Sequence, residues 1–595
     1  MSLLSDYNPL AKIKIAGHII ENPSGVIVVV GPNSSGKTLF LKDIERYLLT
    51  GNSGGVVCNS IDPQPPADAE ELFHELHARH LVRLDQQQQC QVNLPHFSDD
   101  NFPRKPFTLK SLQESGKSFN RGWSANNPNF FGTIGLTLVA YLSLESRRAV
   151  CAEAPAFKYQ QEAPKDPLQA LQLDSDAMKV IGEETGRVFG DAVWLDISDH
   201  STFRLRVSGA PTPPVPGETT NPLRANKYFP IHQAGDGIQS YVGVCICVML
   251  GLRPVVLIDE PEMSLHPPQA YQLGRFIGER SSHSQLTMVA THSGYLLRGI
   301  LDGGKNVRVV RLTRPKDTFV ARSLPNETLR EAVRNPRSRA EATLDGLFSK
   351  SVILVESDGD WEVYGASCES MAAYPSKEIH FVATHGTGGF AELCRFYTSL
   401  GVPVALIADL DLIADTDKMA AVLEALNPCV DHTALIADLR ALSQKLKALP
   451  PAITVEQVKE ELNRLASADY TWATDDDNRL RSRLNDLEQR IKRIRRLKEG
   501  GVKAYEPHPD IHKLFVNLVP KCHHLGVFLV PAGELEDWVP SLMADCGRSR
   551  PKMERALVMA DCIRTATDKT GDIWAFTQAV VQYLELRAVP NQSGS

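Results

Sequence analysis

Residues 25–42 read GVIVVVGPNSSGKTLFLK. A run of β-branched residues from Val26 to Val30 passes into the pattern GxxxxGK[ST] and then into a helical pattern, which is the setting that this pattern requires. Glycines let the backbone curl so that its amides face phosphate oxygens, and the N-terminus of the helix adds favourable partial charge. The stretch predicts a nucleotide-binding α/β domain. Its phosphate-binding loop consists of Gly31, Pro32, Asn33, Ser34, Ser35, Gly36, Lys37 and Thr38.

A second stretch, RPVVLIDEPEMSLHP at 253–267, predicts the rest of this site, because it is an apolar strand that ends in carboxylates. In the loop, Lys37 is expected to reach the β- and γ-phosphates of ATP, and Thr38 to ligate Mg²⁺. Asp259 can hold the Mg²⁺ through water, and Glu260 is placed to polarise the attacking water. An acidic strand-to-turn junction is the simpler reading, but it does not explain why the pair occurs beside a phosphate-binding loop.

Length and composition limit the class of protein. The chain has 595 residues, so two or more domains are expected. A formal net charge of −7 excludes a histone-like polycation, so any contact with nucleic acid must use local basic patches and bound metal. The longest apolar run, residues 241–252, is too short to span a bilayer and is expected to be a buried helix. Scattered cysteines and an N-terminus without a signal-peptide pattern favour a cytoplasmic location.

The second half of the chain contains three apolar strands that each end in closely spaced carboxylates. They occur in LVESDGDWEVY at 354–364, VPVALIADLDLI at 402–413 and GVFLVPAGELEDWV at 526–539. The carboxyl ends of parallel strands meet at one edge of an α/β sheet, where such folds build their sites. Converging carboxylates repel each other unless cations neutralise them, and hard oxygen ligands suit Mg²⁺ or Mn²⁺. Helix N-termini also favour acids, but this explains one cluster rather than three.

The first half resembles the ABC-type ATPases. DEPEMSLHP resembles their Walker B and D-loop segment, and LTMVATHSGYLL at 286–297 ends its strand at His292, which resembles the switch histidine that senses the γ-phosphate. HQAGDGIQSYV at 232–242 occupies the place of the signature loop, with Gly235, Asp236 and Gly237 instead of the usual LSGGQ. The resemblance implies that this loop meets the nucleotide of a partner subunit. It therefore implies a homodimer or a higher homo-oligomer through the ATPase heads.

The second half resembles the TOPRIM domain of topoisomerases, primases and related nucleases, because a glutamate is followed by DLD. The ATPase head, LVE, DLD and GELED together resemble the OLD family of ATPase–nucleases, which includes the nuclease subunit of the Gabija anti-phage system. Ser357 stands where a glycine usually follows the glutamate. The resemblance implies a basic catalytic residue after GELED. Lys552 is our candidate, and Arg548, Arg550 and Arg555 are alternatives. The implied metal ligands are Glu356, Asp360, Asp409, Asp411, Glu534 and Glu536, of which Glu356 and Asp409 are also expected to act in catalysis.

The predicted fold class is α/β. We expect an ABC-type P-loop ATPase domain over 1–315 with insertions at about 50–130, a helical connector over 316–348, and a TOPRIM nuclease domain over 349–595. A helical-hairpin insertion is expected at about 430–505, because leucines and isoleucines with 4-3 spacing in 435–449 and 480–494 predict two packed antiparallel helices. The basic outer side of the second helix and the five arginines of the connector are either nucleic-acid contacts or solvated helix faces, and the hairpin could instead serve oligomerisation.

The predicted function is an ATP-hydrolysing, Mg²⁺- or Mn²⁺-dependent endonuclease of the OLD type. Two nearby metal ions could activate a water and stabilise the leaving oxygen in phosphodiester cleavage. DNA is the expected substrate, in anti-phage defence or nucleic-acid processing, and the resemblance implies a partner protein such as a helicase. No membrane contact is expected. The alternatives are an RNA-cleaving effector, for example against tRNA, and a non-catalytic ATP-gated sensor or scaffold that activates a partner.

Overall fold

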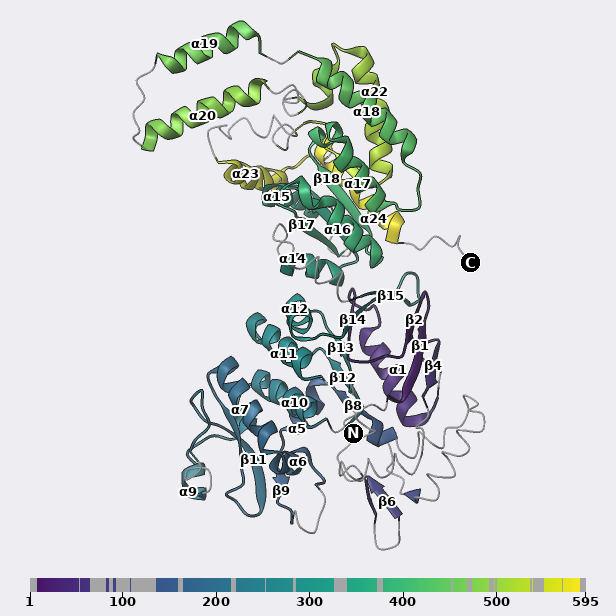
Figure 1. The fold of residues 1–595 in the computed structure, drawn as a ribbon, viewed down its shortest axis with the longest axis vertical. Helices are drawn as coiled ribbons and strands as arrows, with labels where there is room; N and C mark the ends of the chain where they lie inside the picture. The colour runs from purple at the N-terminus through teal and green to yellow at the C-terminus, as the bar shows by residue number, and fades with distance from the viewer. Residues whose placement is uncertain are drawn as a thin grey trace. The chain divides into compact units, whose positions relative to one another are not determined.

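The computed structural model divides the chain into two compact units, Met1–Val333 and Arg334–Ser595, which are described separately (Figure 1). No helix within the described segments is long and apolar enough to cross a membrane. The structure describes residues 8–52, 54–64, 82–84, 89–92, 107–108, 135–158, 164–215, 221–251, 253–281, 285–325, 340–371, 378–450, 453–467, 474–491, 497, 500–533, 535, 538, 551–569 and 571–588.

A six-stranded sheet with the order β15-β14-β3-β13-β12-β8 forms the centre of the first unit. Five of its strands are parallel, and β15 pairs antiparallel with β14 at one edge. Every residue of β3 and β13 is buried, as expected for parallel strands covered on both faces. The strands are β3 (Val26–Val30), β8 (Val139–Leu142), β12 (Val255–Asp259), β13 (Leu286–Ala290), β14 (Val307–Thr313) and β15 (Val320–Pro325).

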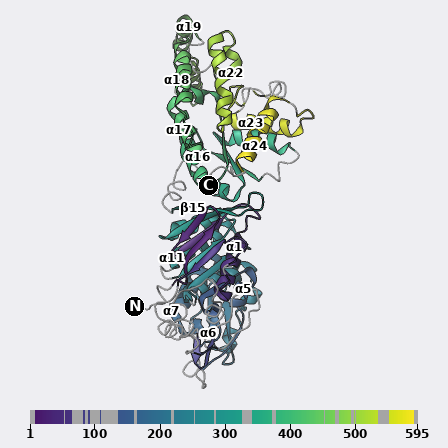
Figure 2. The same ribbon diagram turned by 90° about the vertical axis from the view of Figure 1, so that its right-hand side faces the viewer.

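Helices cover both faces of this sheet, with α1 on one side and α11 on the other (Figure 2). Helix α1 shares a hydrophobic core with the central sheet and with the antiparallel sheet β2-β1-β4. The helices are α1 (Lys37–Thr50), α5 (Leu144–Val150), α6 (Pro167–Leu173), α7 (Ser175–Phe189), α9 (Pro222–Ala225), α10 (Asp236–Leu250), α11 (Pro267–Arg280) and α12 (Gly294–Gly303), with the 3-10 helix η2 (Ile231–Gln233). The smaller strands are β1 (Leu10–Ile15), β2 (His18–Glu21), β4 (Ser60–Pro63), β5 (Val82–Leu84), β6 (Gln89–Val92), β7 (Phe107–Thr108), β9 (Ala154–Pro155), β10 (Val193–Asp196) and β11 (Thr202–Val207).

Helix α10 confirms the buried helix predicted from the apolar run at 241–252, since Tyr241 to Val248 are all buried. It packs tightly against α5. A Cβ atom added to Gly243 would lie 2.2 Å from the carbonyl oxygen of Arg147, so only glycine fits there. This close approach fixes α10 to the helix that follows β8.

The prediction of a helical connector from residue 316 is wrong for residues 320–325, which form β15. Residues 320–325 form the edge strand of the ATPase sheet, because β14 and β15 close as an antiparallel hairpin. A short helix, α14 (Ala340–Asp345), and the 3-10 helix η3 (Gly346–Phe348) come later. Four of the five connector arginines and most of the insertion predicted at about 50–130 lie outside the described residues.

The second unit is built on a parallel sheet with the order β17-β16-β18-β19. Its strands are β16 (Ser351–Val355), β17 (Ile379–Ala383), β18 (Val404–Ala408) and β19 (Val527–Leu529). Three helices share a hydrophobic core with this sheet, namely α15 (Asp358–Glu369), α23 (Lys552–Thr565) and α24 (Asp572–Ala588). Two others contact its strands, α16 (Phe390–Ser399) at β18 and α22 (Pro509–His524) at β19, and α17 (Thr416–Leu426) packs on α16. The 3-10 helices are η5 (Thr387–Gly389), η6 (Leu410–Ala414) and η7 (Gly501–Tyr505).

The insertion is helical as predicted, but the predicted pairing of its helices is wrong. Helix α18 (Thr433–Ala448) packs against α17, α22 and η6. Its leucines Leu439, Leu442 and Leu446 are buried there. The hairpin instead consists of α19 (Val455–Ala466) and α20 (Thr474–Ile491), which lie side by side in Figure 1. They share a small core of Ile453, Leu465 and Leu487.

Candidate ATPase and nuclease sites

The phosphate-binding loop has the backbone that its glycines predict. Gly31 and Gly36 have φ angles of 146° and 93°, and a Cβ atom on Gly31 would lie 2.1 Å from the carbonyl oxygen of Leu312. The buried side chain of Lys37 turns back into the loop, where its Nζ donates to the carbonyl oxygens of Gly31 and Pro32 at 2.9 Å each. The ammonium group is therefore held against the loop backbone.

Thr38 and Asp259 meet although 221 residues separate them. Oδ1 of Asp259 accepts a hydrogen bond from the Thr38 hydroxyl at 3.2 Å, and Oδ2 accepts one from the Tyr141 hydroxyl at 2.9 Å. Burial raises the pKa of Asp259, and the hydrogen bonds from Tyr141 and Thr38 oppose this rise. A hydroxyl and a carboxylate are oxygen donors of the kind that Mg²⁺ prefers, so the pair fits that ion.

Glu260 and His292 are also brought together, as the ends of β12 and β13 are neighbours. Oε1 of Glu260 lies 2.7 Å from Nε2 of His292, and the backbone of Glu260 has a φ of 46°, in the left-handed region. Glu262 links the same two strand ends, because one of its oxygens accepts from the Thr291 hydroxyl and from the His292 amide at 2.7 Å each. Burial raises the pKa of Glu262, and these hydrogen bonds oppose the rise.

Arg147 is the most connected site residue that the sequence analysis missed. Its fully buried guanidinium donates to the carbonyl oxygens of Asp259 and Glu260, at 2.6 and 3.2 Å, and through Nε to the Ser240 hydroxyl of α10 at 2.8 Å. Burial lowers the pKa of Arg147 to about 10, while nearby carboxylates oppose the fall. Arg147 therefore clamps the strand end that carries the two proposed ATPase carboxylates.

Tyr141 and Glu262 were missed as well, although each leaves a trace in the sequence. Tyr141 is a residue with a polar tip inside an apolar strand, and Glu262 is the third carboxylate of DEPE. Nothing comparable distinguishes Arg147 within LESRRAV. Its role depends on helix packing that the local sequence does not encode.

The signature-like segment lies at the start of α10. Gly235 caps the helix and Asp236 is its first residue, 3.4 Å from Arg148. A Cβ atom on Gly237 would lie 2.5 Å from the carbonyl oxygen of Ser264, so this segment packs against the chain that follows Glu260. The contact to a partner's nucleotide that the resemblance implies stays a prediction.

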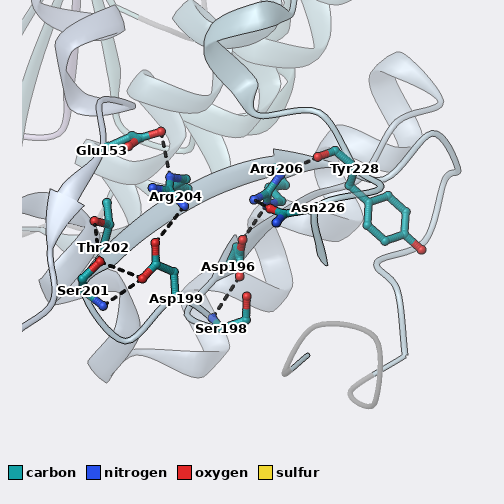
Figure 3. A network of polar contacts seen from close by, with 10 residues as sticks. All are labelled: Glu153, Asp196, Ser198, Asp199, Ser201, Thr202, Arg204, Arg206, Asn226 and Tyr228. Carbon is teal, nitrogen blue, oxygen red and sulfur yellow. Dashed lines mark hydrogen bonds and ion pairs between the residues drawn. The ribbon is translucent and has the colours of Figure 1, made fainter. Parts of the chain in front are cut away.

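A polar network anchors the chain that leads into this segment (Figure 3). The buried Arg206 of β11 pairs with Asp196 at 2.5 Å and donates to the Asn226 side chain and the Tyr228 carbonyl oxygen. Arg204 pairs with Glu153 and Asp199 beside it. The donors of Arg206 thus hold residues 226–228, a few positions before the exposed His232.

In the second unit, the structure places Glu356, Asp409 and Asp411 at one edge of the sheet. Glu356 follows β16 directly, and Asp409 follows the neighbouring strand β18 and caps η6. The loop after β17 encloses the end of β16, because the Gly386 amide donates to the Glu356 carbonyl oxygen at 3.0 Å. Carboxylate oxygens on adjacent strand ends suit a hard divalent cation.

Asp360 has a structural role that the sequence analysis did not predict. Its Oδ2 accepts from the amide and hydroxyl of Ser357 at 2.9 and 2.7 Å, and the Ser357 hydroxyl accepts from the Asp360 amide at 3.3 Å. This reciprocal pair is a capping box at the start of α15. Ser357, the departure from the family pattern, is therefore the N-cap of that helix.

The remaining predicted nuclease residues come from the chain after β19. Glu534, Glu536, Arg548 and Arg550 lie outside the described residues. Lys552 is the exposed first residue of α23. That helix passes close to the start of α15, since a Cβ atom on Gly359 would lie 3.2 Å from Cβ of Ala556. In the part of the chain that the structure describes, no three His, Cys, Asp or Glu side chains gather closely enough to hold a metal ion.

Two family models match the chain. One, described as an AAA domain of a putative AbiEii toxin from a type IV toxin–antitoxin system, matches residues 159–298. The other, described as the TOPRIM domain of overcoming lysogenization defect protein-like proteins, matches residues 347–411. The first match includes Asp259, Glu260 and His292, and the second includes Glu356 and Asp409.

The Old nuclease of Escherichia phage P2 is 24% identical to this chain over 170 residues, which are 27% of this chain and 28% of the phage protein. The C-terminal region of the OLD protein of Xanthomonas campestris pv. campestris is 14% identical with a TM-score of 0.19, over 40% of this chain and 96% of that one. The SMC head domain of Thermotoga maritima is 11% identical with a TM-score of 0.26, over 53% and 97%.

Proposed function

We propose that this chain, an ATPase/TOPRIM protein of the OLD (overcoming lysogenization defect) family, is an ATP-hydrolysing, divalent-metal-dependent endonuclease that cleaves DNA. Anti-phage defence or nucleic-acid processing in the cytoplasm is the proposed setting. The single observation that carries most weight is that Thr38 donates a hydrogen bond to Asp259 while Glu260 lies 2.7 Å from His292, which brings the predicted ATPase residues together at the ends of β12 and β13.

In the proposed ATPase reaction, Lys37 binds the β- and γ-phosphates, and Thr38 with Asp259 would hold Mg²⁺, which supplies charge neutralisation when bound. Glu260 orients the attacking water and accepts its proton. The imidazole of His292 keeps that carboxylate in place at 2.7 Å and lies ready to contact the γ-phosphate. Gly235, Asp236 and Gly237 would contact the nucleotide of a second subunit, in a homodimer or higher oligomer.

In the proposed nuclease reaction, Glu356, Asp409 and Asp411 would hold Mg²⁺ or Mn²⁺, with Glu534 and Glu536 completing the ligand set. Asp360 would add an oxygen to this set while it caps α15. The bound ions supply the activation of water and the stabilisation of the leaving oxygen. Lys552 is proposed to stabilise the transition state. We further propose that nucleotide binding in the first unit controls this site, and that a helicase or other defence protein is a partner.

The test is to incubate purified protein with supercoiled plasmid or total tRNA, with Mg²⁺ or Mn²⁺, and with or without ATP, beside Lys37→Ala and Glu356→Ala. We expect nicked or linear plasmid, abolished by Glu356→Ala and by a chelator, and a changed response to ATP in Lys37→Ala. Cleavage of tRNA alone would assign RNA as the substrate. No cleavage of either would overturn the nuclease proposal and favour an ATP-gated scaffold.

A further inference from the structure

A cavity of about 380 Å³ opens beside Asp411 in the second unit. Three segments of the chain form it, namely the glycine-rich loop after β17, the turn from η6 into α17, and the C-terminal end of α18. Its position next to a proposed metal ligand makes it part of the surface that a nuclease substrate would meet. The charged residues that line it are Asp411, Asp415, Asp417, Lys418 and Lys447, and Thr387 lines it as well.

The helical insertion brings one ammonium group to this cavity. The Ser443 hydroxyl of α18 donates to the carbonyl oxygen of Ala414 at 2.9 Å, so α18 is fixed to the 3-10 helix that carries Asp411. Leu446 is buried, and the next residue of α18, Lys447, has an exposed side chain that lines the cavity. The sequence pattern predicts that α18 belongs to an outer hairpin. Its packing on η6 instead places a cation beside the DLD motif.

Lys418 brings a second ammonium group from α17. Its Nζ donates to the Thr387 hydroxyl at 3.1 Å and pairs with Asp415 at 3.0 Å. The side chains of Lys418 and Asp415 are 48% and 43% exposed, and exposed pairs of this kind contribute little to stability. A phosphate oxygen can therefore replace Asp415 as the partner of Lys418 at little cost.

Two of the three carboxylates that line the cavity have other roles. Asp411 belongs to the proposed metal ligands. Asp415 caps α17 by accepting from the Lys418 amide at 3.2 Å. Burial raises the pKa of Asp415, but the hydrogen bonds and charges of Lys418, with the charge of Lys447, lower it overall, so both ammonium groups act on this one place. The exposed Asp417 is the remaining opposing charge.

We infer that this cavity is a subsite for a backbone phosphate of the nucleic acid next to the phosphate that is cleaved, with Lys418 and Lys447 as its cationic contacts. The inference rests on the proposed nuclease function. A strand whose scissile phosphate lies at Asp409 and Asp411 presents its neighbouring phosphate one nucleoside away, on one side or the other. Contacts of lysine with phosphate fix the register of the strand without reading its sequence.

The test compares Lys447→Met and Lys418→Met with Lys445→Met, a matched control on the same helix that does not line the cavity. Binding of a labelled DNA duplex is followed by fluorescence anisotropy over a series of salt concentrations, and plasmid cleavage gives kcat and KM. Each cavity variant should raise Kd and KM by about 5-fold and reduce the slope of log K against log salt by about 1. The value of kcat should change little, since the contact exists before and during the reaction.

Two further variants sharpen the result, with Lys445→Met again as the control. Lys418→Arg keeps the positive charge and should restore binding relative to Lys418→Met. Asp417→Asn removes the opposing charge and should tighten binding. Lys445→Met should match the wild type.

If both cavity variants cleave DNA as the wild type does, with unchanged Kd and salt slope, the inference is overturned and the proposed nuclease function stands. A wild type that neither binds nor cleaves nucleic acid would overturn both.

Discussion

The proposed ATPase and nuclease sites both lie at the carboxyl ends of parallel strands, but their carboxylates are held in different ways. In the ATPase site, both oxygens of Asp259 accept hydrogen bonds from hydroxyl groups, and the buried Arg147 clamps the backbone beneath them. In the proposed nuclease site, Asp360 is engaged in a helix cap, and Glu356 and Asp409 follow two adjacent parallel strands. Protein donors hold the carboxylate of the first site, whereas the proposed cations would balance the charge of the carboxylates in the second.

The largest effect that follows from this difference is expected for Glu260→Gln. Glutamine keeps the size of the side chain but cannot accept the proton of the attacking water. ATP turnover should fall by about 10²–10⁴-fold, the usual contribution of a positioned general base. Nucleotide affinity should stay within a few-fold, because the Thr38–Asp259 pair is untouched. Measuring kcat together with nucleotide binding tests this, and a variant that hydrolyses ATP normally would remove Glu260 from the chemistry.

Arg147→Met tests whether the ATPase site is preorganised by its clamp. The change keeps an apolar stem but leaves the carbonyl oxygens of Asp259 and Glu260 and the Ser240 hydroxyl without this donor. We expect kcat for ATP to fall by about 10–100-fold, as for residues that orient a metal ligand. The KM for ATP should change less, and a higher Mg²⁺ concentration should be needed.

Arg204→Met is the control, because Arg204 is another arginine of the same unit with several partners, but it pairs with Glu153 and Asp199 in the network of Figure 3. It should leave kcat and the Mg²⁺ requirement unchanged. Equal losses of kcat in both variants would mean that Arg147 acts only through general stability and does not position Asp259 and Glu260.

Metal binding should stabilise the second unit against thermal unfolding in the absence of nucleotide. If Glu356, Asp409 and Asp411 form a cation site, Mn²⁺ at ten times its Kd should stabilise the folded unit by about 1.4 kcal/mol. Thermal melts with and without Mn²⁺, in the absence of nucleotide, measure this shift. Asp409→Asn should abolish it, whereas Asp438→Asn, an exposed carboxylate of α18, should not. An Mn²⁺ shift that survives Asp409→Asn would move the site away from DLD.

The strand ends of both sites could be predicted from the sequence because the signal is local: an apolar β-branched run stops at a carboxylate. The convergence of Asp259 with Thr38 and of Glu260 with His292 followed from the motifs they resemble. Arg147 could not be predicted, since its partners lie on α10 and at the end of β12, and only the packing of α5 on α10 brings it to them. The packing of α18 on η6 and α22 could not be predicted for the same reason, because leucine spacing marks an apolar face but not the surface that covers it.

The smallest effect is expected for substitutions of Ser357. Together with Asp360→Asn, they separate the capping role of Asp360 from its proposed role as a metal ligand. Ser357→Ala removes the side-chain acceptor of the N-cap and should destabilise the start of α15 by about 1 kcal/mol, whereas Ser357→Gly should cost only a few tenths. Hydrogen exchange of the first-turn amides of α15 measures this difference. Asp360→Asn keeps an oxygen acceptor for the cap but loses the charge. If Asp360 also binds metal, this variant should reduce the Mn²⁺ shift while the exchange rates stay near those of the wild type. An undiminished Mn²⁺ shift would leave Asp360 as a cap alone, and the nuclease site would then depend on the carboxylates that follow β16, β18 and β19.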